Sequence, residues 1–468
     1  MAKTEKYISD TIAVMNTLES TKRLRVSNRR SIFKKTSFLK KGKPKGYFLE
    51  IATDAFGKLD VGSKVAADAE NKNIALNITD SYVRYVGSNI TAKTQSHRMQ
   101  LHIFSFRSKG FRDKTAYYFR SVVPIAKEFS FYNIISDESF YNDEFSSRGL
   151  VRVDFNGHEF HVFIADRNKQ RYLCTDCITK LEIDDFMEFN WSIKVGLGYL
   201  LGNLPQDDEY FFAYGNKTMK HFSGFVYRQQ RDSIRTIYTP VNANPFGWIK
   251  SHTIAKKYYG KITEVSPAQV SRLCDIIHKE IDIKAILLLI TESISRSLLI
   301  MPAGLSVALE GLSTFFYQKD SGKLKPIADK NIANEFVNGL KEILDRYKDK
   351  ERFTGYHILL SKIQNINSPT NRELLKAPFS MQGITLTGID EEVLEYRNDF
   401  LHGNINLKPQ KGRKSYTMDG FEISLRLLTL LNMCIMKMAG YSGHIINHVK
   451  TQEKGLGKTI NEDYYRII

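Results

Sequence analysis

Cysteine is scarce in this chain, with four residues among 468. Four cysteines cannot form a disulfide framework for a protein of this size, so we expect a chain that works reduced, in the cytoplasm. Two of them form an isolated Cys-x-x-Cys pair, Cys174 and Cys177. A structural zinc site needs four ligands, and no second pair of this kind follows. The sequence therefore favours two small residues at a strand end and predicts no bound metal.

Long uninterrupted apolar runs are also missing. The two most apolar stretches, residues 283–301 and 423–438, contain charged side chains, among them Glu292 and Arg426. Charges at those depths cost several kcal/mol in lipid, so both stretches are predicted to be buried helices and no membrane span is expected. The first twenty residues likewise lack the apolar run of a secretion signal.

Acidic residues are outnumbered: 51 Asp and Glu stand against 68 Lys and Arg, which gives a formal net charge of +17. Such a surplus attracts polyanions, of which nucleic acid is the commonest. It is concentrated in residues 21–45, which are rich in Lys and Arg and contain no acid. Phe33 and Phe38 are interleaved there, and aromatic rings stack on bases. The segment is predicted to be a basic arm that contacts nucleic acid; the alternative is a solvated arm that keeps the protein soluble.

The length predicts two or three domains, and the character of the chain changes near residue 265. Before it, short alternating or β-branched runs predict strands. The clearest pair, 150–155 and 158–164, flanks Asn156-Gly157, a dipeptide that favours a tight hairpin turn. One helix, 184–201, is predicted within this half. The other predicted strands are 48–53, 74–78, 82–86, 101–106, 116–124, 222–227 and 233–238.

After Pro267 the apolar pattern follows the helical period. Prolines such as Pro302, Pro369 and Pro378 are expected in the loops between helices. The last predicted helix is apolar around most of its circumference, so it must be covered on nearly all sides, within a bundle or by a second chain. The predicted helices are 268–280, 283–299, 305–317, 331–347, 354–366, 388–402 and 418–440.

The expected fold is therefore α+β, with a β-rich N-terminal domain followed by an all-α helical bundle. The β-rich domain covers residues 1–260 and includes the basic arm, the helical domain covers 265–450, and a C-terminal tail covers 451–468. Since the β-rich domain contains no evident catalytic set, a sensing or substrate-selecting role is expected for it.

One predicted helix carries the residues on which the functional interpretation depends. Thr387 and Asp390 form a pattern like a capping box at its start, and Gly403 suits the position after its end. Arg397 falls in the middle of the arc of apolar positions. A buried arginine keeps its charge and needs anionic partners. These are either carboxylates of this chain, in a structural ion pair, or a phosphate held at an interface.

His402 stands in the last turn of the same helix, where the helix dipole and the nearby Asp399 favour its protonated form. An imidazole that titrates near neutrality suits general acid or base catalysis. The segment that follows is basic and has no acidic residue between Asp399 and Asp419. It is predicted to bind RNA phosphates through Lys408, Lys411, Arg413 and Lys414.

The run of Arg397, Asn398 and, four positions later, His402, closed by a glycine, resembles the signature of the HEPN superfamily. These are the helical domains of many anti-phage and toxin ribonucleases. The helix around 308–312 and the β-rich domain in front look most like the ApeA-type branch. The resemblance covers roughly residues 265–450. It implies a homodimer through the helical domain with a composite site from both protomers, and restraint until a phage-derived or other trigger appears, as in abortive infection.

Two functions stand as alternatives. In the first, the protein is a metal-independent endoribonuclease without a cofactor, because the 2′-OH of RNA supplies the nucleophile. His402 then moves the proton, Arg397 neutralises charge on the phosphorane, and Asn398 orients the histidine or a phosphate oxygen. Glu310 and Asp399 are accessory candidates. In the second, it is a non-catalytic nucleic-acid-binding or assembly protein with a degenerate HEPN domain, and Arg397 belongs to a core ion pair.

Overall fold

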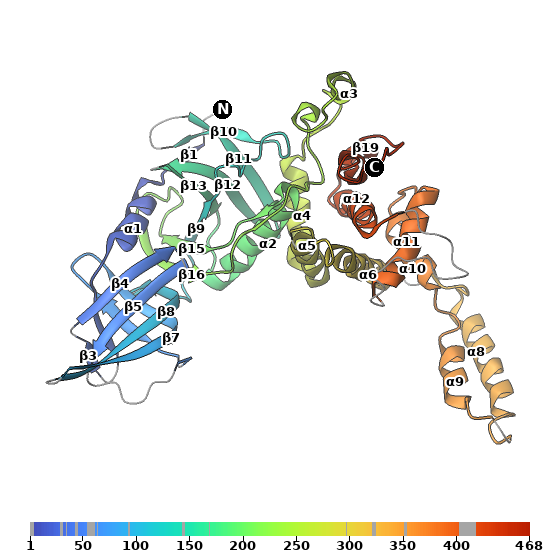
Figure 1. Ribbon diagram of the computed structural model, residues 1–468, viewed down its shortest axis with the longest axis horizontal. Helices are drawn as coiled ribbons and strands as arrows, with labels where there is room; N and C mark the ends of the chain where they lie inside the picture. Colours follow the sequence, from blue (N-terminus) through green and yellow to red (C-terminus); the bar gives the residue numbers. More distant parts are fainter. Residues whose placement is uncertain are drawn as a thin grey trace. The chain divides into compact units, whose positions relative to one another are not determined.

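The computed structural model describes residues 4–28, 31–33, 35–42, 45–53, 61–62, 64–91, 94–142, 146–167, 169–295, 297–320, 324–350, 353–401 and 418–468. The chain forms two compact units, Met1–Pro245 with Tyr258–Lys279 and Phe246–Lys257 with Glu280–Ile468. The first carries a large β-sheet and the second is mainly helical (Figure 1). The expected order, strands first and helices later, is confirmed. We call the two parts the sheet unit and the helical unit.

The sheet unit consists mostly of antiparallel strands, with β1 and β10 paired in parallel. Along the sheet the order is β1-β10-β11-β12-β13-β9-β15-β16-β8-β7-β6-β2-β3, and β4 joins through β5 to β8. The elements are β1 (Glu5–Lys6), α1 (Ser9–Ser20), β2 (Arg25–Asn28), β3 (Ser31–Phe33), β4 (Lys35–Gly42), β5 (Lys45–Thr53), β6 (Ala67–Glu70), β7 (Ala75–Thr91), β8 (Thr94–Ser108), β9 (Tyr118–Ile125), β10 (Glu138–Asn142), β11 (Ser146–Phe155), β12 (His158–Arg167), β13 (Gln170–Cys177), α2 (Ile183–Leu201), β14 (Asn203–Leu204), β15 (Asp208–Tyr214), β16 (Phe222–Gln229), β17 (Ile234–Arg235) and α4 (Pro267–Lys279).

The hairpin predicted around Asn156-Gly157 is present as β11 and β12. Phe155 pairs with His158, and the two turn residues have φ of 49° and 79°. A type I′ turn requires positive φ at both central positions, and asparagine and glycine tolerate it best. The helix predicted over 184–201 is confirmed as α2.

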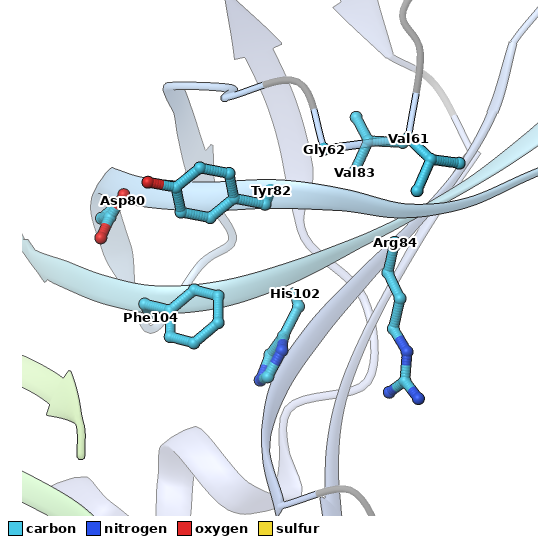
Figure 2. A pocket seen from close by; sticks show the side chains of 8 residues that line it. All are labelled: Val61, Gly62, Asp80, Tyr82, Val83, Arg84, His102 and Phe104. Carbon is cyan, nitrogen blue, oxygen red and sulfur yellow. The ribbon is translucent and has the colours of Figure 1, made fainter. Parts of the chain in front are cut away.

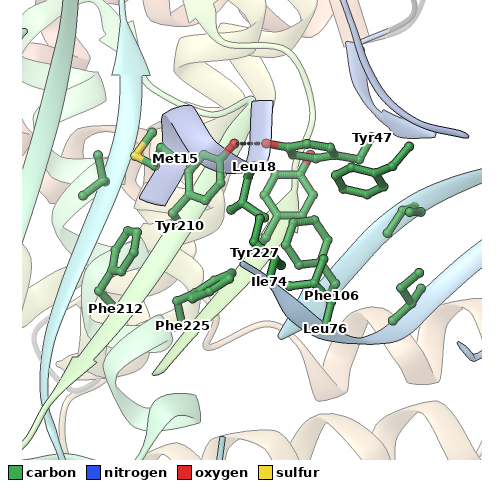
Figure 3. Close-up of a cluster of buried hydrophobic side chains, with 14 of the residues drawn as sticks. Met15, Leu18, Tyr47, Ile74, Leu76, Phe106, Tyr210, Phe212, Phe225 and Tyr227 are labelled. Atoms are coloured by element: carbon green, nitrogen blue, oxygen red, sulfur yellow. Dashed lines mark hydrogen bonds between the residues drawn. The ribbon is translucent and has the colours of Figure 1, made fainter. Parts of the chain in front are cut away.

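Most of the described residues in the basic segment 21–45 belong to strands of the sheet and do not form a free arm. Its described residues include β2, β3 and β4. Phe38 is fully buried, and its ring stacks on Tyr47 at 5.0 Å between centroids. Figure 3 shows Tyr47 in the aromatic core of the sheet unit. The expectation that Phe38 stacks on bases is therefore wrong, because packing in the core removes its ring from water. The side chain of Phe33 lies outside the described residues.

Lys40 shows how a basic residue of this segment is used inside the fold. Its Nζ lies 2.5 Å from Glu19 Oε1 on α1 and 3.3 Å from Asp208 Oδ2 on β15. The lysine therefore ties β4 to two neighbouring elements, and part of the local positive charge is balanced within the sheet unit.

The helix that follows Pro267, α4, packs against β11 and α2 and belongs to the sheet unit. The helical pattern after Pro267 predicts this helix as part of the helical domain, but it belongs to the compact unit that contains the sheet. A Cβ on Gly196 of α2 would lie 3.4 Å from Cys274 Sγ and from Ile277 Cδ1 of α4. Glycine at this position lets the two helices approach closely, so α4 completes the core of the sheet unit.

The helical unit begins with a short helix and continues from residue 280. Two prolines expected in loops lie in its helices: Pro302 in the first turn of α6, where a missing N–H is tolerated, and Pro378 in α10, a helix that was not predicted. The elements are α3 (His252–Tyr258), α5 (Ile281–Ile294), α6 (Met301–Lys319), α8 (Lys330–Asp345), α9 (Tyr356–Gln364), α10 (Asn371–Ser380), α11 (Gly388–Leu401), α12 (Gly420–Met438), β18 (His444–Ile446), α13 (His448–Thr451) and β19 (Tyr465–Ile467).

The helix α12 lies at the centre of this unit. It packs against α6, α11, α13 and β18, and its side chains are buried on nearly all sides, as predicted. Residues 451–468, expected to form a tail, take part in the same unit, because β19 pairs with β18. The helices α8 and α9 pack against each other. Among the residues that the structure describes, none of the helices has the length and apolar character needed to cross a membrane.

Candidate functional site

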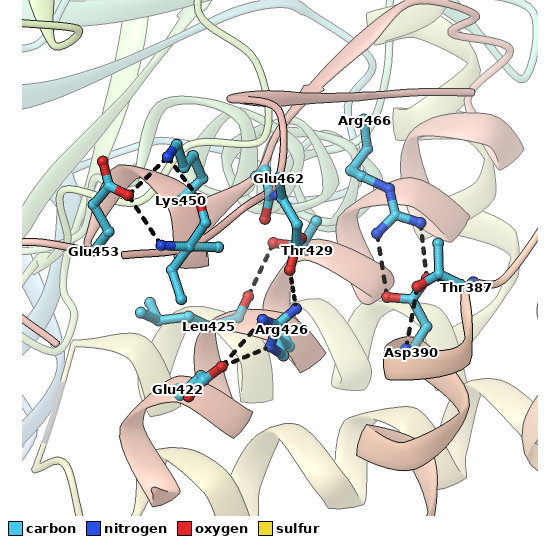
Figure 4. Close-up of polar contacts among 12 residues, drawn as sticks. Thr387, Asp390, Glu422, Leu425, Arg426, Thr429, Lys450, Glu453, Glu462 and Arg466 are labelled. Atoms are coloured by element: carbon cyan, nitrogen blue, oxygen red, sulfur yellow. Dashed lines mark hydrogen bonds and ion pairs between the residues drawn. The ribbon is translucent and has the colours of Figure 1, made fainter. Parts of the chain in front are cut away.

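The helix that carries the Arg-Asn motif is α11, and side chains fix its start (Figure 4). Thr387 donates its backbone N–H to Asp390 Oδ2 at 2.8 Å and its hydroxyl to the same oxygen at 2.7 Å. In return, the backbone N–H of Asp390 donates to Thr387 Oγ1 at 3.3 Å. The capping box predicted from the sequence is therefore confirmed.

Arg466 of β19 holds the same carboxylate from another side. Its Nη1 lies 3.2 Å from Asp390 Oδ1 and its Nη2 lies 2.8 Å from Oδ2. Burial alone would raise the pKa of Asp390, but the hydrogen bonds and charge of Arg466, together with hydrogen bonds from Thr387, outweigh it and lower this pKa. The carboxylate therefore stays ionised and fastens the first turn of α11 to β19.

The inward side of α11 is apolar, as predicted. Val393 and Leu394 are buried, and Tyr396 is buried with its hydroxyl 2.5 Å from Glu392 Oε1. By the helical repeat, Arg397 follows Val393 by about one turn. The helix α11 packs against α6, α10 and α12.

The chemistry-bearing residues lie at and beyond the end of this helix. Arg397, Asn398 and Asp399 belong to the last turns of α11, and their side chains are outside the described residues. His402 lies outside the described residues altogether, as do the predicted phosphate-binding residues Lys408, Lys411, Arg413 and Lys414. Their roles stay predictions.

Glu310, the accessory candidate outside the motif, lies on α6, which packs against α11. It is partly exposed, whereas Ala308, Leu309 and Leu312 around it are fully buried. A Cβ on Gly311 would lie 3.1 Å from Ile286 Cγ1 of α5. Residues 308–312, on which the family resemblance partly rests, therefore pack within the helical unit. The catalytic role of Glu310 stays a prediction.

A buried ion network fastens α12 to the segment before β19 (Figure 4). Arg426, only 4% exposed, donates from Nε and Nη2 to Glu422 Oε1 at 3.1 Å and from Nη1 to Glu462 Oε1 at 2.7 Å. Asn447 donates to the other oxygen of Glu462 at 3.0 Å. Arg426, whose charge argues against a membrane span, therefore forms a structural ion pair between α12 and the C-terminal residues.

The Cys-x-x-Cys pair lies at the end of β13, as predicted, and both thiols are buried and free. Burial raises the pKa of Cys174 to about 12, so this thiol stays protonated. Asp176 between the two cysteines is held by Arg120 and Lys6, at 2.6 Å and 2.7 Å. Among the described residues, no group of His, Cys, Asp and Glu side chains has the arrangement needed for a metal ion.

Sequence reasoning missed a hollow of about 510 Å³ on β7 and β8 (Figure 2). We call it the sheet-face hollow. Tyr82 of β7 stands opposite His102 of β8 in the antiparallel ladder. Leu101 and Ile103, the neighbours of His102 on β8, are fully buried, so the hollow lies on the face of these strands turned away from the core. Its lining includes Val61, Asp80, Tyr82, Arg84, His102 and Phe104.

Comparison of the chain with protein-family models, with curated proteins and with solved structures finds no match. The family resemblance therefore rests on the motif residues themselves and on the helix that carries them.

Proposed function

We propose that this protein is a metal-independent endoribonuclease of the HEPN type that acts in anti-phage defence of the abortive-infection kind. The observation that carries the proposal is the sequence run of Arg397, Asn398 and His402, whose first two residues belong to the last turns of α11. Support comes from the way this helix is held: Asp390 and Arg466 fix its start, and its apolar side packs within the helical unit. A catalytic group needs such a firmly held helix, because small displacements cost rate.

The proposed reaction uses the nucleophile that RNA already carries. The 2′-oxygen attacks the adjacent phosphorus, the bond from phosphorus to the 5′-oxygen breaks, and the products are a 2′,3′-cyclic phosphate and a 5′-hydroxyl. His402 takes the proton from the 2′-OH or gives one to the leaving 5′-oxygen. Arg397 neutralises the charge that grows on the phosphorane oxygens, and Asn398 orients the histidine or a phosphate oxygen. Lys408, Lys411, Arg413 and Lys414 bind the flanking phosphates.

The proposed active form is a homodimer. On one straight helix, positions 397 and 402 are separated by about 140° around the axis, so the two groups converge only if the last turn unwinds or if two chains pair these helices. Pairing two copies lets the arginine of one and the histidine of the other face one phosphate. The composite site is what the family resemblance implies, and it removes this geometrical conflict.

Exposed apolar side chains on α8 support association of two copies. Ile332, Phe336 and Ile343 are 58%, 47% and 52% exposed. Together with Gly339 they fall within an arc of about 60° on the helix, at the alternating spacing of three and four residues typical of paired helices. Covering this stripe with the same stripe of a second copy would remove it from water.

The sheet unit is proposed to sense the trigger or select the RNA, and the protein is proposed to act in the cytoplasm. The net charge of +17 suits a polyanionic ligand, and the four cysteines are free thiols. A ribonuclease that is toxic to its own cell needs restraint, and a separate sensing unit is a physical means of providing it.

The proposal is tested by measuring cleavage of a mixed RNA population by the purified full chain in EDTA. We expect His402→Ala and Arg397→Ala each to slow cleavage by about a hundredfold or more. His357→Ala is the matched control, because Arg352 and His357 have the same spacing and His357 is exposed on α9. The proposal is overturned if His402→Ala cleaves RNA at the wild-type rate, or if the wild type does not cleave RNA.

A further inference from the structure

The aromatic rings in the sheet-face hollow are held in place by their neighbours. His102 stacks on the fully buried Phe48, with 4.5 Å between ring centroids and 12° between the planes. Phe104 lies 4.3 Å from His102 and 5.7 Å from Tyr82, the second contact being edge-on. Tyr82 is nevertheless 38% exposed. The hollow thus offers a ring surface that is already ordered, and a flat ligand can stack on it with little loss of side-chain freedom.

The charged residues at the hollow are positive in sum. Lys64 Nζ lies 3.2 Å from Asp80 Oδ1 and 5.9 Å from the centre of the Tyr82 ring. This pair balances the carboxylate, and Arg84, whose guanidinium lies 5.8 Å from the Phe48 ring, adds a further positive charge. Figure 2 shows Arg84 beside His102, away from Asp80. The hollow therefore combines an aromatic wall with a cation, which suits a ligand made of a flat ring and an anionic group.

We propose that the sheet-face hollow binds single-stranded RNA, with one unpaired base against Tyr82 and Phe104 and an adjoining phosphate at Arg84. The inference rests on the proposed function in taking RNA as the substrate, and it adds where the strand is held. An unpaired base exposes its flat face for stacking, whereas the bases of a duplex stack on one another. Stacking is available to every base, so the hollow grips unpaired strands without reading a sequence.

The same residues disfavour other ligands. A cationic ligand for the aromatic wall would meet the charges of Arg84 and Lys64, since Asp80 is already paired. An apolar peptide would gain from the rings but nothing from the guanidinium. A nucleic-acid strand can contact the rings with a base and the guanidinium with a phosphate. Its phosphates repeat at each base, which matches a ring and a cation on the same sheet face.

The test measures binding of a short fluorescein-labelled oligouridine to the full chain by fluorescence anisotropy. Every protein in the series carries His402→Ala, so that the RNA is not consumed. We expect Tyr82→Ala to weaken binding about tenfold or more, Tyr82→Phe to preserve it, and Arg84→Gln to weaken it with a smaller dependence on salt. The matched control is Tyr132→Ala, which removes an exposed tyrosine (68%) elsewhere on the sheet unit and should leave binding unchanged.

A second arm uses the same RNA annealed to its complement, which should bind more weakly than the single strand and lose little with Tyr82→Ala. The inference is overturned if Tyr82→Ala binds the single strand as tightly as the parent does, or if the duplex binds equally well. If the wild type cleaves RNA but Tyr82→Ala binds the single strand as tightly as the parent, the proposed binding site is wrong and the ribonuclease proposal stands. If RNA binding depends on Tyr82 but the wild type does not cleave RNA, the proposed binding site stands and the ribonuclease proposal is wrong.

Discussion

Arg466 of β19 binds both carboxylate oxygens of Asp390 in the first turn of α11, at 3.2 Å and 2.8 Å. The side chain of Asp390 is 3% exposed and that of Arg466 is 18% exposed, so water competes little for the pair. The motif helix therefore depends on a residue 76 positions away for the placement of its start.

Removing this pair should weaken the helical unit. We expect Asp390→Ala to lower its free energy of unfolding by about 2–3 kcal/mol, because the change removes the cap and leaves Arg466 without its carboxylate. Urea unfolding followed by circular dichroism measures the effect. Arg372→Ala is the control: it removes an exposed pair with Glu391 on the same helix, and unfolding should hardly change. Equal effects of the two changes would contradict the structural role of Asp390.

The buried histidine of α13 predicts a dependence of stability on pH. Burial lowers the pKa of His448 from 6.5 to about 3, and Asn432 Nδ2 lies 3.1 Å from its Nε2. Below pH 6.5 the unfolded chain binds a proton at this residue and the folded chain does not. The stability that the neutral, buried His448 contributes to the folded chain is therefore complete above pH 6.5 and is lost as the pH falls toward 3.

The loss should reach about 1.4 kcal/mol per pH unit in the middle of this range. Urea unfolding at pH 7, 6 and 5 is compared for the wild type and His448→Gln, and the variant should show a shallower decline by about that amount. Equal slopes for the two proteins would show that His448 does not supply this dependence.

An apolar stripe on α8 predicts the oligomeric state. Phe336→Glu combined with Ile343→Glu places two charges in the exposed stripe, so this double variant should be monomeric, whereas the wild type is predicted to be a dimer. Light scattering after size-exclusion chromatography measures the mass. Asn338→Glu is the control, because Asn338 is exposed on the opposite side of the helix and its variant should remain dimeric. A wild type that is monomeric at all concentrations would contradict the proposed pairing.

Local patterns were sufficient to predict the elements whose causes are local. Asn156 and Gly157 supply the backbone geometry of the β11–β12 turn, and Thr387 with Asp390 supplies the cap of α11. The missed helices also carried signals. Thr370 and Glu373 form a capping box at the start of α10, but Pro378 argued against a helix there. In α1, Ile12, Met15 and Leu18 follow the helical period and are buried.

The tertiary placement could not be read from periodicity. Phe38 lies in a basic segment, and only the pairing of β4 with β5 shows that its ring meets Tyr47 in the core. Similarly, Tyr82 and His102 are 20 positions apart and become neighbours through the register of β7 and β8. Nothing in either strand alone indicates that register. The pairing of Asp390 with Arg466 likewise requires the fold of the C-terminal residues.

The chemistry of the RNA ends tests the central claim most directly. RNA incubated with the purified full chain in EDTA is mapped at its new termini, with His402→Ala treated in parallel. We predict 2′,3′-cyclic phosphate and 5′-hydroxyl ends from the wild type and none from the variant, because the RNA supplies its own nucleophile and His402 moves the proton. New ends that carry a 3′-hydroxyl and a 5′-phosphate, or cyclic-phosphate ends produced equally by His402→Ala, would contradict it.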